Sequence, residues 1–212
     1  YGMIDTISDG VTINAASYAL WNHGDGYESK KTMVAASLGT SSKGYDTRRD
    51  TLYEYGNVPT IQTIRDVTIT ATGTTALRNS GHVVMLEGTT LRAAKDVVDN
   101  YKDGTRTEQK TRVQYGYGVA EYGFNAYSGE SDSSGFKYIP SQINTIKDCT
   151  ITSTGSGAIA IKNAGKIGTI SGNTVTATGV AISNTERARG ASTQIATVSG
   201  FNGAWTVTPA PG

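Results

Sequence analysis

A three-part phrase recurs along the chain, and it constrains the fold more than any other feature of the sequence. The phrase reads Ile-x-Thr-Ile, then Thr-Ile/Val-Thr, then Ala-Leu/Ile-x-Asn. Clear copies occupy 61–79, 143–163 and 167–184, looser copies occupy 4–22 and 86–100, and a degenerate sixth runs from 195 to 207. Ile64 and Leu86 are 22 positions apart, and Ile146 and Ile170 are 24 apart. Repeats of this length indicate a solenoid, in which each unit buries its apolar face against its neighbours.

Each copy consists of three short β-rich stretches separated by Gly, Asp or Asn, a pattern typical of one turn of a parallel β-helix. Leucine-rich repeats have a similar period, but the six Leu residues of this chain are too few for that fold. We therefore predict an all-β, right-handed parallel β-helix of about five to six turns, with one extra residue near Gly10 that we interpret as a β-bulge. We interpret 1–212 as a single β-helix domain, a fragment of a longer chain, with a C-terminal linker over 208–212.

Alternation within the second part of the phrase predicts which side chains face the core. In 67–71, the residues Val67, Ile69 and Ala71 are expected to point inward and the Thr side chains outward. The same register places Cys149 and Asn173 inward. A buried lone Cys is expected to behave as an inert small hydrophobe, and a buried Asn needs a hydrogen-bond partner.

One repeat position, the last of the phrase, is Asn in five of the six copies. Its members are Asn22, Asn79, Asn100, Asn163 and Asn184. Asn tolerates the left-handed turn conformation, and stacked amides can bond along the axis of a solenoid. We predict a structural ladder of side-chain amides at this corner.

Two long inserts interrupt the repeats, and both leave from this corner. They cover about 23–58 and 101–140, and a shorter excursion covers 185–194. Insertions at one repeat position project on one side of a solenoid, often the binding side. The long inserts hold ten of the 12 Tyr residues. Tyr brings contact area and a hydrogen bond at low entropic cost, so these loops resemble recognition surfaces.

The candidate binding residues all come from the long inserts. They are Tyr53, Tyr55, Tyr101, Arg112, Tyr115, Tyr117, Tyr122, Phe124 and Tyr127. The alternative is that the insert Tyr residues pack onto the coil as small satellite cores. Residues 110–119 alternate like a strand, and they are expected to form a hairpin with 121–127.

Tests for other chemistry are negative, so no catalytic residue, metal ligand or cofactor is assigned. Asp99 and Asp103 resemble the start of a calcium loop, but Tyr101 and Lys110 occupy positions that the motif reserves for ligands. His23 and His82 are the only histidines and lack metal spacing. A net charge of +1 argues against a nucleic-acid partner. No apolar run is long enough for membrane insertion as a helix.

The repeated phrase resembles the right-handed parallel β-helix of the pectin-lyase-like superfamily. More narrowly, it is similar to the Ile-Ser-Gly-Asn-Thr-Val/Ile-Thr repeats of large secreted or wall-anchored proteins from gut-dwelling Gram-positive bacteria. The resemblance covers about half the chain and implies an extracellular or cell-surface location. Enzymes of that superfamily carry clustered Asp, Lys and Arg on an outward strand face. The outward positions here are mostly Thr, so no catalytic residue is carried over.

Our leading hypothesis is a non-catalytic recognition or adhesion module, a rigid coil whose Tyr-rich inserts bind a host glycan or a host or mucosal protein. One alternative is a polysaccharide-active enzyme, a lyase or glycoside hydrolase, with a site built from the inserts. Another is a Thr ladder similar to that of ice-binding solenoids, or a structural spacer. The open ends of such a coil also allow end-to-end self-association.

Overall fold

The computed structural model describes the backbone of residues 3–23, 30–40, 46–55, 58–101, 105–120, 123–184, 194–200 and 207–208. Side chains are described for 3–23, 58–101, 139–184 and 194–200. The chain divides into two compact units. The first comprises Tyr1–Gly26, Asn57–Thr105 and Tyr138–Gly212, and the second comprises Tyr27–Gly56 and Arg106–Lys137.

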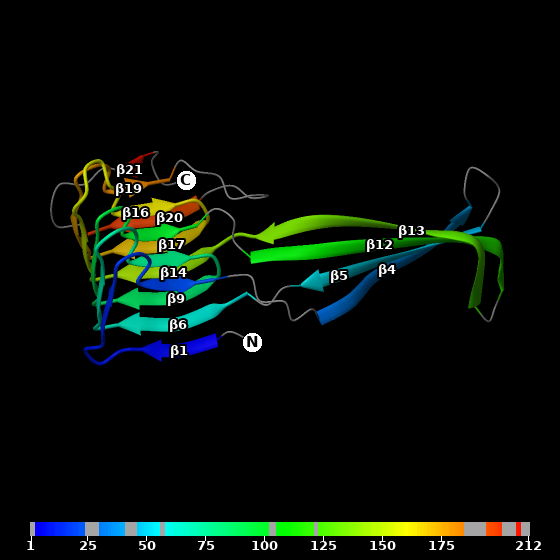
Figure 1. Cartoon of the computed structure of the whole chain (residues 1–212), viewed down its shortest axis with the longest axis horizontal. Coiled ribbons are helices and arrows are strands. Elements are labelled where there is room, and N and C mark those ends of the chain that lie inside the picture. The colour runs from blue at the N-terminus through cyan, green and yellow to red at the C-terminus, as the bar shows by residue number, and fades with distance from the viewer. Residues whose placement is uncertain are drawn as a thin grey trace. The chain divides into compact units, whose positions relative to one another are not determined.

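The first unit is a coil of three parallel sheets, and each of its first five turns contributes one strand to each sheet in order (Figure 1). The described part of the sixth turn contributes β20 to the first sheet and β21 to the third. The first sheet contains β1 (Met3–Ile7), β6 (Thr60–Arg65), β9 (His82–Glu87), β14 (Gln142–Lys147), β17 (Lys166–Ser171) and β20 (Gln194–Ser199). The second sheet contains β2 (Thr12–Ala15), β7 (Thr68–Ala71), β10 (Thr90–Ala93), β15 (Thr150–Ser153) and β18 (Thr174–Thr176). The third sheet contains β3 (Leu20–Asn22), β8 (Leu77–Asn79), β11 (Val98–Asn100), β16 (Ile161–Asn163), β19 (Ile182–Ser183) and β21 (Val207–Thr208). This arrangement confirms the predicted parallel β-helix.

The strand register matches the alignment of the repeats. Leu91 pairs with Ile151, which pairs with Val175, so the divergent third turn occupies its predicted place. The extra residue of the first turn is also present, because Ile7 pairs with Ile64 at an offset of 57 and Thr12 pairs with Thr68 at an offset of 56. It lies in the turn between β1 and β2, so it does not interrupt a strand.

The core consists of inward columns that run through the turns. Val67, Ile69 and Ala71 are buried, as their alternation with Thr predicts. Cys149 and Asn173 are buried in the column of Val67, with Thr89 between Val67 and Cys149. Asn173 finds the partners that its burial requires, because its Oδ1 accepts from Cys149 N at 2.9 Å and its Nδ2 donates to Ile146 O at 3.0 Å.

The five repeated asparagines form a continuous amide ladder at the corner that follows the third sheet. Each Nδ2 donates to the Oδ1 of the next turn: Asn22 to Asn79 at 2.8 Å, Asn79 to Asn100 at 2.9 Å, Asn100 to Asn163 at 2.7 Å and Asn163 to Asn184 at 2.8 Å. The Nδ2 groups also donate to backbone carbonyls of neighbouring segments, such as Gln142 O and Lys166 O. The ladder thereby satisfies backbone groups at a corner where the chain leaves the sheets.

Where no insert follows the ladder, Gly makes the tight corner possible. Gly81 N and Gly165 N each donate to the ladder Asn two positions earlier, at 3.1 Å. A Cβ atom at either Gly would lie 2.2 Å from a backbone carbonyl oxygen, of Pro59 or Ser141 respectively. Only a residue without a side chain fits this approach between successive turns.

The second unit is a single four-stranded sheet in the order β13-β12-β5-β4, built from β4 (Lys30–Thr40), β5 (Asp46–Tyr55), β12 (Thr105–Ala120) and β13 (Gly123–Ile139). Figure 1 shows these four long strands side by side. Of the predicted hairpin strands 110–119 and 121–127, the first falls in β12 and the described part of the second, 123–127, falls in β13. The sequence did not reveal that the two inserts pair with each other, with β5 antiparallel to β12 from Glu54–Glu108 to Asp46–Gly116.

Candidate functional site

Most of the candidate binding residues predicted from the inserts have side chains outside the described part of the chain. Their backbones are placed in the second unit: Tyr53 and Tyr55 on β5, Arg112, Tyr115 and Tyr117 on β12, and Phe124 and Tyr127 on β13. Tyr122 lies outside the described residues altogether. Tyr101 is the one candidate whose side chain is described. Its ring lies against Arg78 of the third sheet, on a surface of the coil.

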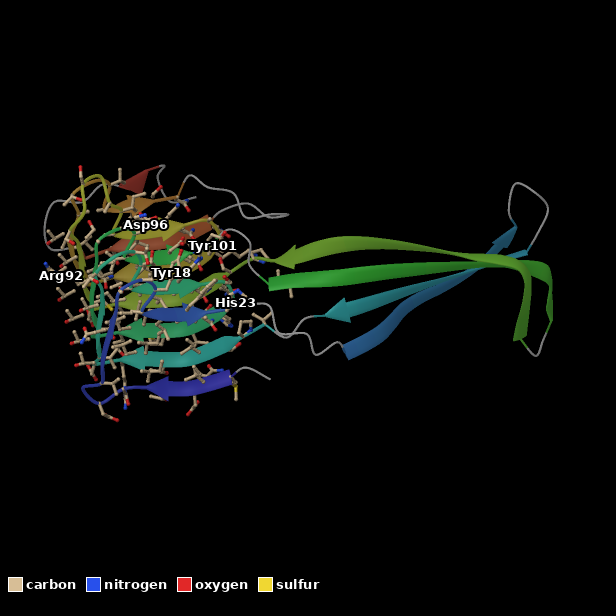
Figure 2. The ribbon with its side chains drawn as sticks, viewed as in Figure 1. Tyr18, His23, Arg92, Asp96 and Tyr101 are labelled. Atoms are coloured by element: carbon tan, nitrogen blue, oxygen red, sulfur yellow. The ribbon has the colours of Figure 1, made fainter. Side chains whose placement is uncertain are left out.

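This surface is the outer side of the third sheet. Trp21 pairs with Arg78, Arg78 with Asp99 and Asp99 with Lys162, so one outward column carries these side chains on successive strands. Neighbouring strands are about 4.8 Å apart, which brings each residue of the column into reach of the one on the adjacent strand. We call this column, together with Tyr18, His23, Asp96 and Tyr101, the third-sheet face. Figure 2 labels Tyr18, His23, Asp96 and Tyr101 on the coil.

Arg78 lies at the centre of an aromatic cluster. Its Cζ is 3.6 Å from the ring centroid of Tyr101, 5.0 Å from that of Tyr18 and 5.2 Å from that of Trp21. Its Nη1 donates to Tyr18 Oη at 2.6 Å. A guanidinium within about 6 Å of a ring face is attracted by the ring quadrupole, and desolvation strengthens that attraction. Arg78 therefore holds together the Tyr18 and Trp21 rings at β3 and the Tyr101 ring that follows β11.

Trp21 combines exposure with a fixed ring orientation. Its side chain is 44% exposed, and Tyr18 is 36% exposed. The His23 ring meets it edge-on, at 4.4 Å between centroids and an interplanar angle of 79°. The Tyr18 ring lies 5.3 Å from it at a tilt of 40°. Because three neighbours restrain this large ring, a ligand that stacks on it would need little further ordering of the protein.

The charges of the third-sheet face are arranged in pairs. Arg78 Nε lies 3.7 Å from Asp99 Oδ2, an ion-pair distance that is too long for a hydrogen bond. Lys162 Nζ lies 3.6 Å from Asp96 Oδ2. All four side chains are at most one-quarter exposed, so these pairs are screened less by solvent than free surface charges.

The third-sheet face corrects one interpretation of the sequence. Outward positions are mostly Thr in the second sheet, but in the third sheet they carry an aromatic ring, two cations and an acid. The signal was present in the phrase itself, as the variable position immediately before the ladder Asn. The residues at this position are larger and more often charged than the Thr residues of the second sheet. The outer side of the third sheet therefore presents aromatic and ionisable groups to solvent.

The outer side of the second sheet carries two columns. The first is Thr throughout, at positions 12, 68, 90, 150 and 174. The second reads Asn14, Thr70, Arg92, Thr152 and Thr176 in register. Arg92 is exposed, and in Figure 2 it lies at the left edge of the coil, away from Tyr18 and Tyr101. A long cation in the middle of the second column interrupts the flat Thr ladder.

Other reactive groups are accounted for by local structure. Cys149 is buried, and its Sγ donates to Lys147 O at 3.2 Å. Burial raises the pKa of this thiol to about 11, so it stays protonated at neutral pH and is a poor nucleophile. His82 Nε2 lies 3.0 Å from Asn144 Oδ1. Among the described residues, no group of three or more His, Cys, Asp or Glu is placed to hold a metal ion.

Within the described parts of the chain there is no helix that is both long enough and apolar enough to cross a membrane. Comparison of the chain with protein-family models, with curated proteins and with solved structures finds no match.

Proposed function

We propose that the chain is a non-catalytic recognition module that binds a glycan through the third-sheet face. The observation that carries this proposal is the exposed Trp21 ring, held by Tyr18, His23 and Arg78 on a rigid parallel sheet. Small-ligand sites combine aromatic surface with a few placed polar groups, and this face has both.

A sugar ring suits such a surface because it has an apolar side of C–H groups and a rim of hydroxyls. The C–H side stacks on an exposed aromatic ring and removes both from water. The hydroxyl rim requires hydrogen-bond partners, and the carboxylates of Asp96 and Asp99 and the ammonium of Lys162 lie further along the same sheet, two and three strands from Trp21. The extended outward column therefore offers polar contacts beside the aromatic platform.

The Tyr-rich inserts belong to the same proposal as a second contact region, with a host or mucosal protein as an alternative partner. The similarity of the repeats to those of secreted and wall-anchored bacterial proteins supports an extracellular or cell-surface location. Both the host origin of the ligand and this location are proposals that rest on that resemblance.

A glycan array probed with the intact chain tests this function, using Trp21→Ala as the key variant. Val11→Ala is the matched control, because Val11 is a similarly exposed apolar side chain (43%) outside the face. We expect the chain to retain a set of glycans, Trp21→Ala to lose them by at least about tenfold, and Val11→Ala to keep them. Absence of glycan binding, or equal binding by Trp21→Ala, contradicts the proposal.

A polysaccharide-active enzyme is the second candidate, and one observation favours it. Asp96, Asp99, Arg78 and Lys162 gather acids and cations on one outward face, the kind of grouping that acid–base chemistry on a polymer requires. Incubation with plant, bacterial and mucin polysaccharides, followed by measurement of new reducing ends and unsaturated products, tests it. Product formation that Asp99→Asn abolishes would favour the enzyme over the binding module.

A further inference from the structure

The third-sheet face carries two cations and two carboxylates, and each cation lies beside a carboxylate. Arg78 is paired with Asp99 and Lys162 with Asp96. The formal charges of these four side chains sum to zero. A ligand that approaches this face therefore meets no net charge from these four paired side chains.

The guanidinium of Arg78 is also in contact with the neighbouring aromatic side chains. The Tyr101 ring covers the guanidinium at 3.6 Å, and Nη1 is used by the Tyr18 hydroxyl. The side chain is only 13% exposed. A carboxylate or sulfate on a ligand would have to displace these contacts to reach the guanidinium in a bidentate manner, which is the usual way in which Arg binds such groups.

The carboxylates of Asp96 and Asp99 repel an acidic ligand directly. An anion placed close enough to contact Lys162 or Arg78 would also lie close to one of these acids, and juxtaposed like charges disfavour binding. By contrast, the hydroxyls of a neutral sugar can donate to the carboxylates and accept from the ammonium without bringing in charge.

We propose that the third-sheet face selects neutral glycans over sialylated, sulfated or uronic-acid glycans. This inference rests on the proposed glycan-binding function and specifies the ligand class of the same surface. In it, Trp21 supplies the stacking platform, Arg78 positions the rings, and Asp96 and Asp99 exclude anionic sugars.

The test uses matched glycan pairs, each a neutral oligosaccharide and its sialylated or sulfated derivative, presented to the intact chain. We expect the neutral member of each pair to bind at least about tenfold more tightly. We also expect its affinity to change by less than about twofold between low and high salt, because no net charge is neutralised on binding.

In the same experiment, the variant Asp96→Asn tests whether the carboxylate sets the preference for neutral glycans. This variant keeps an Oδ1 acceptor for Ile159 N but removes the acid beside Lys162, so acidic glycans should gain affinity relative to the wild type. Glu87→Gln is the matched control, since Glu87 pairs with Lys147 on the first sheet and its loss should leave the preference unchanged.

The outcomes separate the two proposals. Trp21-dependent binding of acidic glycans in preference to neutral ones overturns the inference and leaves the glycan-binding function standing. An unchanged preference in Asp96→Asn also overturns the inference, because the acids then do not set the specificity. Absence of binding to every glycan, neutral or acidic, overturns both.

Discussion

The amide ladder gives the coil a direction at the level of single residues. Every Nδ2 points toward the Oδ1 of the following turn, from Asn22 through to Asn184. Asn79, Asn100 and Asn163 are fully buried, so water cannot replace a lost partner easily. The first five copies of the repeat all carry Asn at this position, because its amide combines a donor and an acceptor at the length that this geometry requires.

Asn100→Ala should therefore destabilise the coil by about 2 to 3 kcal/mol, because it removes the buried hydrogen bonds of the Asn100 amide to Asn79, to Asn163 and to the Lys166 carbonyl. Chemical denaturation followed by circular dichroism measures the change. Thr150→Ala, an exposed position on the second sheet, is the control and should cost less than about 0.5 kcal/mol. Equal stability of the two variants would contradict the energetic role of the ladder.

Cys149 makes a pH-dependent contribution to stability. Burial raises the pKa of its thiol from 9.0 to about 11, so the folded state holds a proton that the unfolded state loses at lower pH. The stabilisation by the neutral thiol is complete below about pH 9 and is lost as the pH rises toward about 11. Over that window the wild type should lose roughly 2 to 3 kcal/mol more than Cys149→Ser, whose hydroxyl does not titrate.

Denaturation of both proteins at several pH values checks this, because the titration of other groups is common to the two. The serine is expected to donate to Lys147 O, as the hydroxyl of Thr89 donates to Glu87 O in the same column. Parallel curves for wild type and variant across the window would show that Cys149 is not buried as described.

At the scale of elements, the pairing of the two inserts stabilises two hairpins that would each be weak in isolation. A two-stranded hairpin is marginally stable in water, and the β5–β12 pairing converts two of them into a four-stranded sheet. Residues about 60 positions apart in the sequence thereby depend on one another, as Asp50 and Arg112 do in register.

Deletion of Arg106–Lys137 should leave the coil folded with a single cooperative transition, because each turn of the coil is stabilised by its neighbouring turns. The amides of β5 should exchange much faster with solvent, since their β12 partner is gone. Hydrogen exchange with mass spectrometry reports both effects. Loss of cooperative unfolding would mean that the coil needs the insert, and unchanged exchange in β5 would mean that the inserts do not pair.

The sequence predicted the coil well because its repeat is locally encoded. The repeat period can be read from this single sequence. It reveals the alternation in 67–71, the alignment of the divergent third turn and the repeated Asn position. The extra residue near Gly10 was found for the same reason, although it lies in a turn and not in a strand.

The third-sheet face was not predicted because its residues come from separate turns and share no pattern except their position. Trp21, Arg78, Asp99 and Lys162 are chemically different, so a search for repeated residues passes over them. Tyr18 and Tyr101 lie 83 positions apart (101 − 18), and only the stacking of turns brings both to Arg78. The pairing of the inserts was missed for a similar reason, since its register is long-range.

For the whole molecule, stability is a sum over stacked turns, so one buried charge in the middle of the stack should affect every sheet. Ile151 is fully buried in β15, between Leu91 and Val175. Ile151→Asp should unfold the coil, because an unpaired buried charge costs several kcal/mol (~5 or more). The adjacent Thr150→Asp places the same charge on the exposed side and should melt close to the wild type. Similar melting temperatures for the two variants would contradict the assigned facing.

The central claim is that Trp21 on the third-sheet face contacts the ligand, and a fluorescence titration tests it most directly. Trp21 and Trp205 are the two tryptophans of the chain, so Trp205→Phe leaves Trp21 as the single reporter. Titration of this variant with a neutral glycan retained on the array should change Trp21 emission saturably, with the same dissociation constant as an independent calorimetric measurement. Calorimetric binding without any change in Trp21 emission would place the ligand elsewhere and contradict the account.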